Sequence, residues 1–253
     1  MTISVIMPAY NAARFIEVAL RSLLQECPRL ALDIIVIDDG STDATRDIVA
    51  GLAALHPEIR LLQNPRKGIA AARNTGLANL PADCEFVAFM DADDASADGR
   101  LSYQRALLLG DPAVEVVYSR LEMFTVFDDA ALVPRAGSRT KVIRGPYLQS
   151  AMYRPHVFAR VGTFDERYRQ GCDTDYVLRV LESGTKLVLD DTIAAYYRRH
   201  DTNVTLNTAE MQHEFRLATL KWAARNRLRG ADVPDIYRQL FLRRDQIEGD
   251  FSG

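Results

Sequence analysis

The sequence predicts an α/β fold, a mostly parallel sheet flanked by helices and followed by a helical C-terminal extension. Short apolar runs rich in β-branched residues alternate with segments of about 10–15 residues whose apolar positions follow helical spacing, which is typical of βαβ units. The apolar runs are continuous, as expected for strands that are buried on both faces. Polar or glycine residues follow the runs, and loops after parallel strands lie along one edge of the sheet.

The first hundred residues contain the clearest elements. We expect strands at 3–7, 33–37, 59–62 and 86–90 and helices at 12–25, 44–55 and 69–80. Pro8 is expected to end the first strand, because proline cannot donate to the ladder. Asn11 is expected to cap the first helix, since asparagine is a preferred N-cap residue.

The pattern is looser after residue 100. We expect a helix at 101–109, a strand at 114–118, a hairpin or mobile loop at 121–143, a helix at 173–181, strands at 186–189 and 192–197, an amphipathic helix at 209–229 and a frayed tail at 242–253. This second half would cover the first.

Composition excludes several classes of protein. With 253 residues, of which 48% are hydrophobic and 26% charged, the chain can build an ample globular core. A formal net charge of −3 gives no reason to expect a nucleic-acid partner. The three cysteines are widely separated and lack metal-ligand spacing, which favours a reducing compartment. We see no signal peptide and no apolar run near about 20 residues, and so expect a cytoplasmic chain.

Three carboxylates follow the last strand of the first half within four residues. Asp91, Asp93 and Asp94 would lie at the carboxyl end of a central strand, where ligands bind in open α/β sheets. Unpaired buried carboxylates are costly, whereas closely spaced ones suit a divalent cation that keeps several waters and binds a phosphate. The alternative is an acidic turn in which Asp94 or Ser96 caps the next helix.

Two earlier loops could contact a ligand at the same edge. Tyr10 could stack on a planar base, or be an ordinary half-buried aromatic residue. Asp39 could accept a hydrogen bond from a base or a ribose, or form an Asx turn. Asp43 fits helix capping, and so we assign Asp43 to structure and Asp39 to the ligand.

Two common nucleotide-binding motifs are missing. Pro-Ala-Tyr-Asn stands where a dinucleotide-binding fold would carry G-x-G-x-x-G, and there is no G-x-x-x-x-G-K-[ST], which disfavours an NAD enzyme and a P-loop ATPase. Lys67 and Gly68 could still hold a phosphate at a helix N-terminus. Arg73 could pair with a phosphate or a strand-end carboxylate, or be a solvated helix arginine.

Four motifs follow one another in order over residues 3 to about 100: Pro8-Ala9-Tyr10-Asn11, Asp38-Asp39-Gly40-Ser41-Thr42-Asp43, Lys67-Gly68 with Ala72-Arg73-Asn74-Thr75-Gly76, and Asp91-Ala92-Asp93-Asp94. Together they resemble the signature set of the family 2 glycosyltransferases, which have the Rossmann-like GT-A fold. The resemblance implies that a nucleotide-sugar donor binds across the first half. It implies a substrate-binding set of Pro8, Ala9, Tyr10, Asn11, Asp39, Lys67, Gly68, Arg73, Asn74, Asp91, Ala92 and Arg198.

The same resemblance assigns the metal ligands. Asp91-Ala92-Asp93 corresponds to the "DxD" motif, which implies that Asp93 is a direct ligand of Mn²⁺ or Mg²⁺, with Asp91 beside it. Residues 196–200, Tyr-Tyr-Arg-Arg-His, are similar to a late "YR-x-H" segment of the family. That similarity implies that Arg198 or His200 reaches the diphosphate or the metal.

The acceptor side carries a thinner resemblance. Residues 161–166 and 171–179 are similar to the segment in which the family places a Glu-Asp pair at the start of a helix, where the Asp is the catalytic base. The resemblance therefore assigns Asp173 as the base, with Asp175 as the second choice; the alternative for Asp175 is a carboxylate favoured by the helix dipole. Cys172 departs from the family, since it stands where Glu is common, and we do not expect it to be a nucleophile.

Basic residues in the last forty could form a membrane-surface helix pair or a solvated face packed on the catalytic domain. They are Lys221, Arg225, Arg227, Arg229, Arg238, Arg243 and Arg244. A membrane-surface pair would suit contact with the inner face of the membrane and a lipid-linked acceptor.

We therefore expect a catalytic domain at 1–205, with a donor half at 1–100 and an acceptor half at 101–205, and a helical extension at 206–253. The expected reaction is metal-assisted, inverting transfer from a UDP- or dTDP-type donor to a saccharide or lipid-linked acceptor in cell-surface polysaccharide synthesis. The alternatives are a degenerate nucleotide-sugar-binding protein and a nucleotidyltransferase. Nucleic acid is not an expected partner, and a homodimer is compatible with the sequence.

Overall fold

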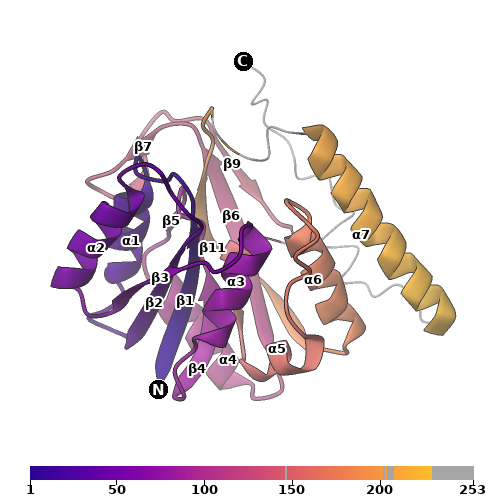
Figure 1. The fold of residues 1–253 in the computed structure, drawn as a ribbon. Coiled ribbons are helices and arrows are strands. Elements are labelled where there is room, and N and C mark those ends of the chain that lie inside the picture. The colour runs from indigo at the N-terminus through magenta and orange to yellow at the C-terminus, as the bar shows by residue number, and fades with distance from the viewer. Residues whose placement is uncertain (146, 202, 204–207, 230–253) are drawn as a thin grey trace.

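The computed structural model describes residues 1–145, 147–201, 203 and 208–229. In this part of the chain, helices flank a sheet of nine strands on both faces, which confirms the predicted fold class (Figure 1). The strands of the sheet are β1 (Thr2–Ala9), β2 (Leu32–Asp38), β3 (Ile59–Gln63), β4 (Cys84–Phe89), β5 (Ala95–Ser96), β6 (Val116–Phe124), β9 (Thr140–Ile143), β10 (Ala151–Tyr153) and β11 (Leu187–Arg198). The helices are α1 (Ile16–Leu24), α2 (Thr45–Leu55), α3 (Ile69–Ala78), α4 (Arg100–Gly110), η1 (Leu148–Ser150), α5 (His156–Val161), α6 (Cys172–Glu182) and α7 (Thr208–Arg229).

The strand order brings the ends of distant strands to one edge. The order is β3-β2-β1-β4-β10-β6-β11-β5, with β9 paired to β6. The strands β1 to β4 are parallel to one another, and β10 is antiparallel to both β4 and β6. Since β10 is antiparallel to both of its neighbours, β6 runs parallel to β4. The strand β6 and its parallel neighbour β11 therefore end at the same edge as β1 to β4. Ligand sites of open α/β sheets lie at this edge.

Both faces of the sheet are covered, which explains the continuous apolar runs. In β2, Ile34 and Val36 belong to a core shared with α1, α2 and α4. Ile35 and Ile37 point the other way, into a core shared with α3, α5 and α6. All four side chains are fully buried, so no position of this strand tolerates a polar residue without a partner.

Pro8 does not end the first strand, which continues to Ala9. The pairing of β1 with β4 stops at Ile6, whose carbonyl accepts a hydrogen bond from Met90 N. The backbone groups of residues 6 and 8 both point toward β4. Because β4 no longer pairs with β1 at residue 8, the N–H that Pro8 lacks would have had no partner in the sheet.

Asn11 does not cap the first helix, which begins five residues later at Ile16. The backbone of Asn11 has a φ of +48°, in the left-handed region that asparagine tolerates better than most residues. Its Oδ1 accepts a hydrogen bond of 2.8 Å from Thr42 N, and its own N donates to Ser41 Oγ at 3.0 Å. The side chain therefore joins the loops after β1 and β2.

The second half differs more from the prediction. The strands expected at 186–189 and 192–197 form one strand, β11, and the segment 121–143 contains the end of β6, the small hairpin of β7 (Phe127–Asp128) and β8 (Val133–Pro134), and β9. We did not predict η1, β5, β10 or α5, which are too short for a periodic signal. Ser96 lies in β5 and α4 begins only after Gly99, so the acidic helix cap considered for Asp94 or Ser96 is wrong.

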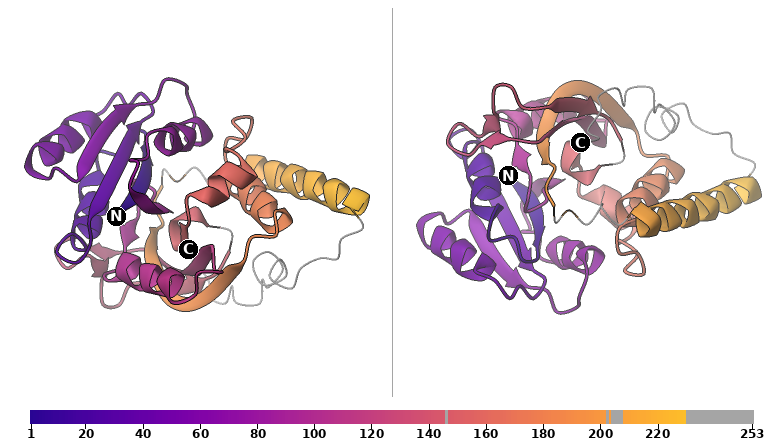
Figure 2. Two further views of the ribbon diagram at one scale, coloured as in Figure 1. Left: turned by 90° about the horizontal axis from the view of Figure 1, so that it is seen from below. Right: turned by 90° about the horizontal axis from the view of Figure 1, so that it is seen from above.

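The helix predicted at 209–229 is α7, which packs on α6 on the side away from the sheet (Figures 1 and 2). Its buried residues Glu214, Ala218 and Trp222 recur every fourth position, whereas Leu217 and Leu220 are exposed. The apolar residues are therefore not confined to the packed face. No helix in the described ranges is long and apolar enough to cross a bilayer.

Two basic residues of the predicted membrane-facing cluster point toward the protein. Lys221 lies 3.8 Å from Asp165, and Arg225 forms an ion pair of 2.8 Å with Glu182 of α6. These two residues fit the packed-face alternative. The domain boundary expected at residue 205, the tail at 242–253 and the basic residues beyond 229 lie outside the described residues.

Candidate active site

The loops after β1, β2 and β3 meet at the carboxyl edge of the sheet, as predicted. The Lys67 ammonium lies 5.5 Å from the centre of the exposed Tyr10 ring. Asp39 accepts hydrogen bonds from Gly68 N at 3.0 Å and from Asn64 Nδ2 at 2.6 Å. Gly68 has a φ of +110°, which glycine adopts without strain. Tyr10 is thus available for stacking, and the Asp39 carboxylate, which can accept about four hydrogen bonds, keeps acceptor capacity.

The predicted contacts Pro8 and Ala9 form the end of β1 beneath this edge. Ala9 is buried, and its carbonyl accepts a hydrogen bond of 2.8 Å from Asp39 N. This bond fixes Asp39 next to the first strand. Ala9 therefore acts on Asp39 through its backbone, and the contact of residues 8 and 9 with a substrate stays a prediction.

Arg73 is the centre of the site. Only 1% of its surface is exposed, so the solvated-arginine alternative is wrong. Its guanidinium forms an ion pair with the Asp173 carboxylate at the start of α6 and another, of 3.3 Å, with Asp91 after β4. Burial opposes the charge of Arg73, but the two carboxylates outweigh it and hold the pKa of Arg73 above its ordinary value. One buried cation thus joins the predicted DxD segment to the predicted base.

The three strand-end carboxylates have different surroundings. Burial raises the pKa of Asp91 to about 6, although Arg73 opposes the shift. Asp94 is almost fully buried, and burial together with Asp93 and Asp91 raises its pKa well above the ordinary range. The Asp94 carboxyl accepts hydrogen bonds from Arg198 N at 2.8 Å and from Gln149 Nε2 at 3.3 Å. Asp94 therefore joins the loop to β11.

Asp93, predicted to be the direct metal ligand, lies next to His200, which is predicted to reach the diphosphate or the metal. Asp93 Oδ2 is 3.0 Å from His200 Nε2 and 3.4 Å from Asn203 Nδ2. The imidazole packs against Phe15, with 4.5 Å between ring centres. Among the described residues, no group of three His, Cys, Asp or Glu side chains is arranged to hold a metal ion alone. Magnesium usually takes one or two carboxylates plus substrate phosphates, and Asp93 offers one such carboxylate, with His200 beside it.

Arg198 contacts the backbone of the loop that carries Asp93. Its guanidinium lies about equally far from the ring centres of Phe15, Phe124 and Phe127, at 5.0, 5.2 and 4.9 Å. Arg198 Nε donates a hydrogen bond of 3.1 Å to the Asp93 carbonyl. Burial lowers its pKa, and its contacts hold the backbone at Asp93. Its predicted contact with a diphosphate stays a prediction.

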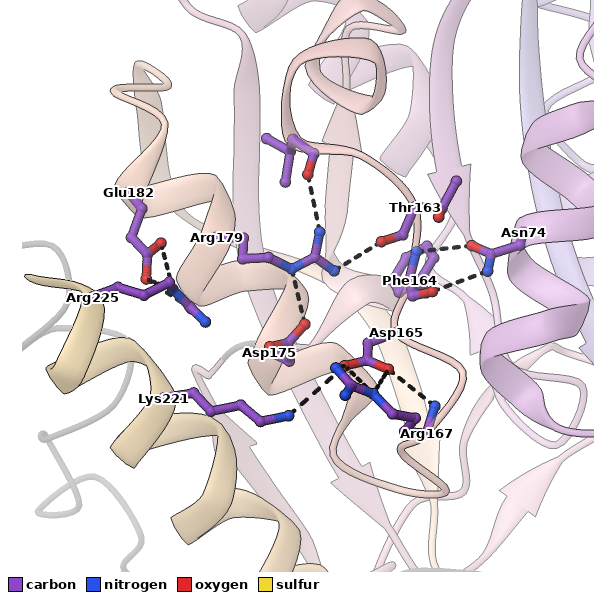
Figure 3. Close-up of polar contacts among 11 residues, drawn as sticks. Asn74, Thr163, Phe164, Asp165, Arg167, Asp175, Arg179, Glu182, Lys221 and Arg225 are labelled. Atoms are coloured by element: carbon purple, nitrogen blue, oxygen red, sulfur yellow. Dashed lines mark hydrogen bonds and ion pairs between the residues drawn. The ribbon is translucent and has the colours of Figure 1, made fainter.

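The start of α6 separates the two base candidates. The Asp173 side chain is 23% exposed and faces Arg73. The Asp175 side chain is 4% exposed, and its carboxylate accepts a hydrogen bond of 2.9 Å from Arg179 Nε (Figure 3). Cys172 is fully buried, and burial raises the pKa of its thiol, so the sulfur stays neutral and unreactive. The geometry favours Asp173.

Asn74 links the two halves of the chain. Asn74 Nδ2 donates to the Phe164 carbonyl at 3.0 Å, and Asn74 Oδ1 accepts from Phe164 N at 2.8 Å (Figure 3). Asn74 Nδ2 also donates to Glu166 Oε1 at 2.9 Å. Its polar groups are thus engaged within the protein. Whether they also contact a substrate, as the sequence suggested, stays a prediction.

Replacing Asn74 with alanine is expected to lower the free energy of unfolding by about 1–3 kcal/mol, because buried backbone groups of Phe164 would lose their partner. Urea denaturation measures this change. Asn79→Ala is the matched control: Asn79 Nδ2 donates to the Thr75 carbonyl of its own helix at an exposed position, and a change within about 0.5 kcal/mol is expected. Equal losses in the two variants would contradict the link.

Three features of the site have no local sequence signal. The phenylalanines around Arg198 come from two distant segments, Asn203 lies beyond the predicted motif, and Glu214 of α7 reaches the loop before α6. Each acts through a partner that is remote in the sequence. Only an alignment of related chains or the fold itself could reveal them.

The comparisons with known proteins agree with this geometry. The family profile described as "Glycosyl transferase family 2" matches residues 4–165. The chain is 28% identical to the succinoglycan biosynthesis protein ExoA of Rhizobium meliloti (strain 1021), over 77% of this chain and 63% of that one. It is 32% identical to the pre-mycofactocin glycosyltransferase of Mycobacterium tuberculosis (strain CDC 1551 / Oshkosh), over 73% of this chain and 40% of that one. These matches span less than two thirds of each relative's own length.

Solved structures share the fold. S. aureus TarS 1-349 in complex with UDP-GlcNAc superposes with a TM-score of 0.70 at 18% identity, over 94% of this chain and 69% of that one. The mannosyltransferase PcManGT of Pyrobaculum calidifontis, in complex with GDP-Man and Mn²⁺, superposes with a TM-score of 0.69 at 21% identity, over 94% of this chain and 67% of that one. Since the family profile covers well over half of the sequence and the fold agrees, the chain belongs to glycosyl transferase family 2.

Proposed function

We propose that the protein transfers a sugar from a UDP- or dTDP-linked donor to a hydroxyl of a saccharide or a lipid-linked acceptor, with inversion and with the help of Mn²⁺ or Mg²⁺. The observation that carries the proposal is the buried Arg73, which joins Asp91 at the end of β4 to Asp173 at the start of α6. Asp91 on the donor side and the proposed base Asp173 on the acceptor side thus lie on either side of the same guanidinium.

The donor half is residues 1–100. Tyr10 would stack on the base, Asp39 would accept a hydrogen bond from the nucleoside, and Lys67 beside them would lie near the phosphates. UDP-GlcNAc is bound by S. aureus TarS, which has the same fold, and this supports a UDP-type donor. Nothing in the first loop supports a nucleotidyltransferase, because that loop, at residues 8–11, is neither glycine-rich nor basic.

The proposed reaction is a single displacement. Asp173 takes the proton of the acceptor hydroxyl, the acceptor oxygen bonds to the anomeric carbon, and the bond from that carbon to the β-phosphate oxygen breaks, which releases the nucleoside diphosphate. Cys172 is a buried neutral thiol, so no covalent nucleophile stands beside the base, and one displacement inverts the anomeric carbon. Asp93 and His200 would hold the cation, which neutralises charge on the leaving diphosphate.

We further propose that residues 101–205 form the acceptor half and that the enzyme acts in the cytoplasm, in cell-surface polysaccharide synthesis. Cys27, Cys84 and Cys172 are free thiols, which fits a reducing compartment. The succinoglycan biosynthesis protein ExoA, a relative over 77% of this chain, supports a polysaccharide product.

A thermal-shift screen tests the donor site. UDP, GDP, dTDP and CDP are each added with Mn²⁺ and with EDTA. At about 100 times the dissociation constant, a ligand that binds only the native state adds about 2.7 kcal/mol, or roughly 5–10 °C for a chain of this size. We expect a rise with UDP or dTDP that EDTA removes. No rise with any nucleotide would favour a degenerate protein, and pyrophosphate release from a nucleoside triphosphate would favour a nucleotidyltransferase.

A further inference from the structure

Glu214 of α7 binds the loop that leads into α6. Its carboxylate accepts hydrogen bonds from three successive backbone N–H groups, those of Arg169 at 3.0 Å, Gln170 at 2.7 Å and Gly171 at 2.6 Å. The Glu214 side chain is 8% exposed. Hydrogen bonds to an ionised acceptor are about twice as strong as neutral ones, so this carboxylate restrains three consecutive peptide units at once.

Gly171 is shaped for the same contact. A Cβ added at this position would lie 2.8 Å from Glu214 Cβ, closer than real Cβ atoms pack, and a tight 3.3 Å from the Glu214 carbonyl carbon. The φ of Gly171 is −85°, so glycine is required here by the close approach of α7 and not by the backbone conformation. The loop and the helix therefore meet at backbone distance.

The restrained loop ends two residues before Asp173. The Gly171 carbonyl accepts the first helical hydrogen bond of α6, 3.0 Å from Asp175 N. The position of Gly171 thus fixes where α6 begins and where the Asp173 carboxylate meets Arg73. A displacement of about 1 Å at a reacting group can cost about 100-fold in rate.

We propose that Glu214 is a positioning residue for the base: by binding the backbone of residues 169–171, it sets the place of Asp173 relative to the acceptor hydroxyl. The inference rests on the proposed function, in which Asp173 is the base. It makes the C-terminal helix a part of the acceptor site.

Other contacts keep α7 docked when Glu214 is changed. Ala218 and Trp222 are buried in the core that contains α6. Lys221 lies near Asp165, and Arg225 pairs with Glu182 at the far end of α6 (Figure 3). Loss of the Glu214 charge should therefore loosen the loop without releasing the helix.

The test compares Glu214→Gln with Arg225→Met, which breaks a contact between α7 and α6 remote from Asp173. We expect Glu214→Gln to lower kcat about 10- to 100-fold, while KM for the donor and UDP binding stay within about threefold. Arg225→Met should lower the melting temperature about as much as Glu214→Gln does, but it should leave kcat within about twofold of the native value. Amide exchange of residues 169–171 should become faster only in Glu214→Gln.

Gly171→Ala disturbs the same contact from the side of the loop and should show the same loss of kcat. This second variant keeps the test informative if Glu214→Gln folds poorly. An unchanged kcat in Glu214→Gln, or equal losses of kcat in Glu214→Gln and Arg225→Met, would overturn the positioning role. Absence of transfer by the native chain with every donor would instead overturn the proposed function, and this inference with it.

Discussion

Replacing Asp173 with asparagine is expected to lower kcat for sugar transfer by about 10²–10⁴-fold, the usual contribution of a general base. Asparagine keeps the shape of the side chain and a carbonyl oxygen for Arg73, but it cannot take the proton of the acceptor hydroxyl. Donor affinity should stay within about threefold, because Asp173 is assigned no donor contact. Steady-state kinetics and calorimetry with the nucleoside diphosphate measure the two quantities.

Asp165→Asn is the matched control for Asp173→Asn. Asp165 lies in the loop between α5 and α6, close in sequence to Asp173, but its carboxylate pairs with Arg167 and lies near Lys221 (Figure 3). This variant should keep its kcat within about twofold, even if it melts at a lower temperature. Substantial transfer by Asp173→Asn would move the base elsewhere, and the burial and ion pair of Asp175 make that residue a poor replacement.

The donor half could be predicted from the sequence because its signals are local. Each βαβ unit lies within about 30 contiguous residues, and both faces of its strands are apolar. The carboxyl ends of parallel strands must then share one edge, and this rule is enough to bring the loops that carry Tyr10, Asp39 and Lys67 together. The sequence leaves Arg73 with three alternatives, a phosphate, a strand-end carboxylate or solvent, and the structure pairs it with the carboxylate of Asp91.

The acceptor half could be predicted only in part, because its geometry depends on remote partners. The strands β5 and β10 have two and three residues, too few for a periodic pattern, and their partners are remote in the sequence: β5 pairs with β11, and β10 pairs with β4 and β6. Arg198 gives no sign in the sequence that three phenylalanines surround it. Asn11 resembles a helix cap because asparagine favours both caps and left-handed turns, and only its bond to Thr42 decides between them.

Replacing Asp93 with alanine is expected to abolish the metal dependence of nucleotide binding while the fold persists. Asp93 is one of the two side chains that we propose hold the cation, and removal of a ligand should weaken binding in Mn²⁺ by at least about 10–100-fold. The fold should tolerate the change, because the charge of Asp93 helps to raise the pKa values of the buried Asp91 and Asp94. Its removal relieves that repulsion, which offsets the lost contact with His200.

Melting curves of Asp93→Ala with UDP in Mn²⁺ and in EDTA measure the effect, and the two curves should coincide. Asp98→Ala is the matched control, since Asp98 lies five residues on and pairs with Arg29 at the surface; it should keep the native difference between Mn²⁺ and EDTA. If nucleotide binding by Asp93→Ala still depends on the metal, the cation is held by other groups. Asp91 would then be the nearest candidate, and the metal would have to compete with Arg73 for its carboxylate, whereas Asp173 would keep its own ion pair with Arg73.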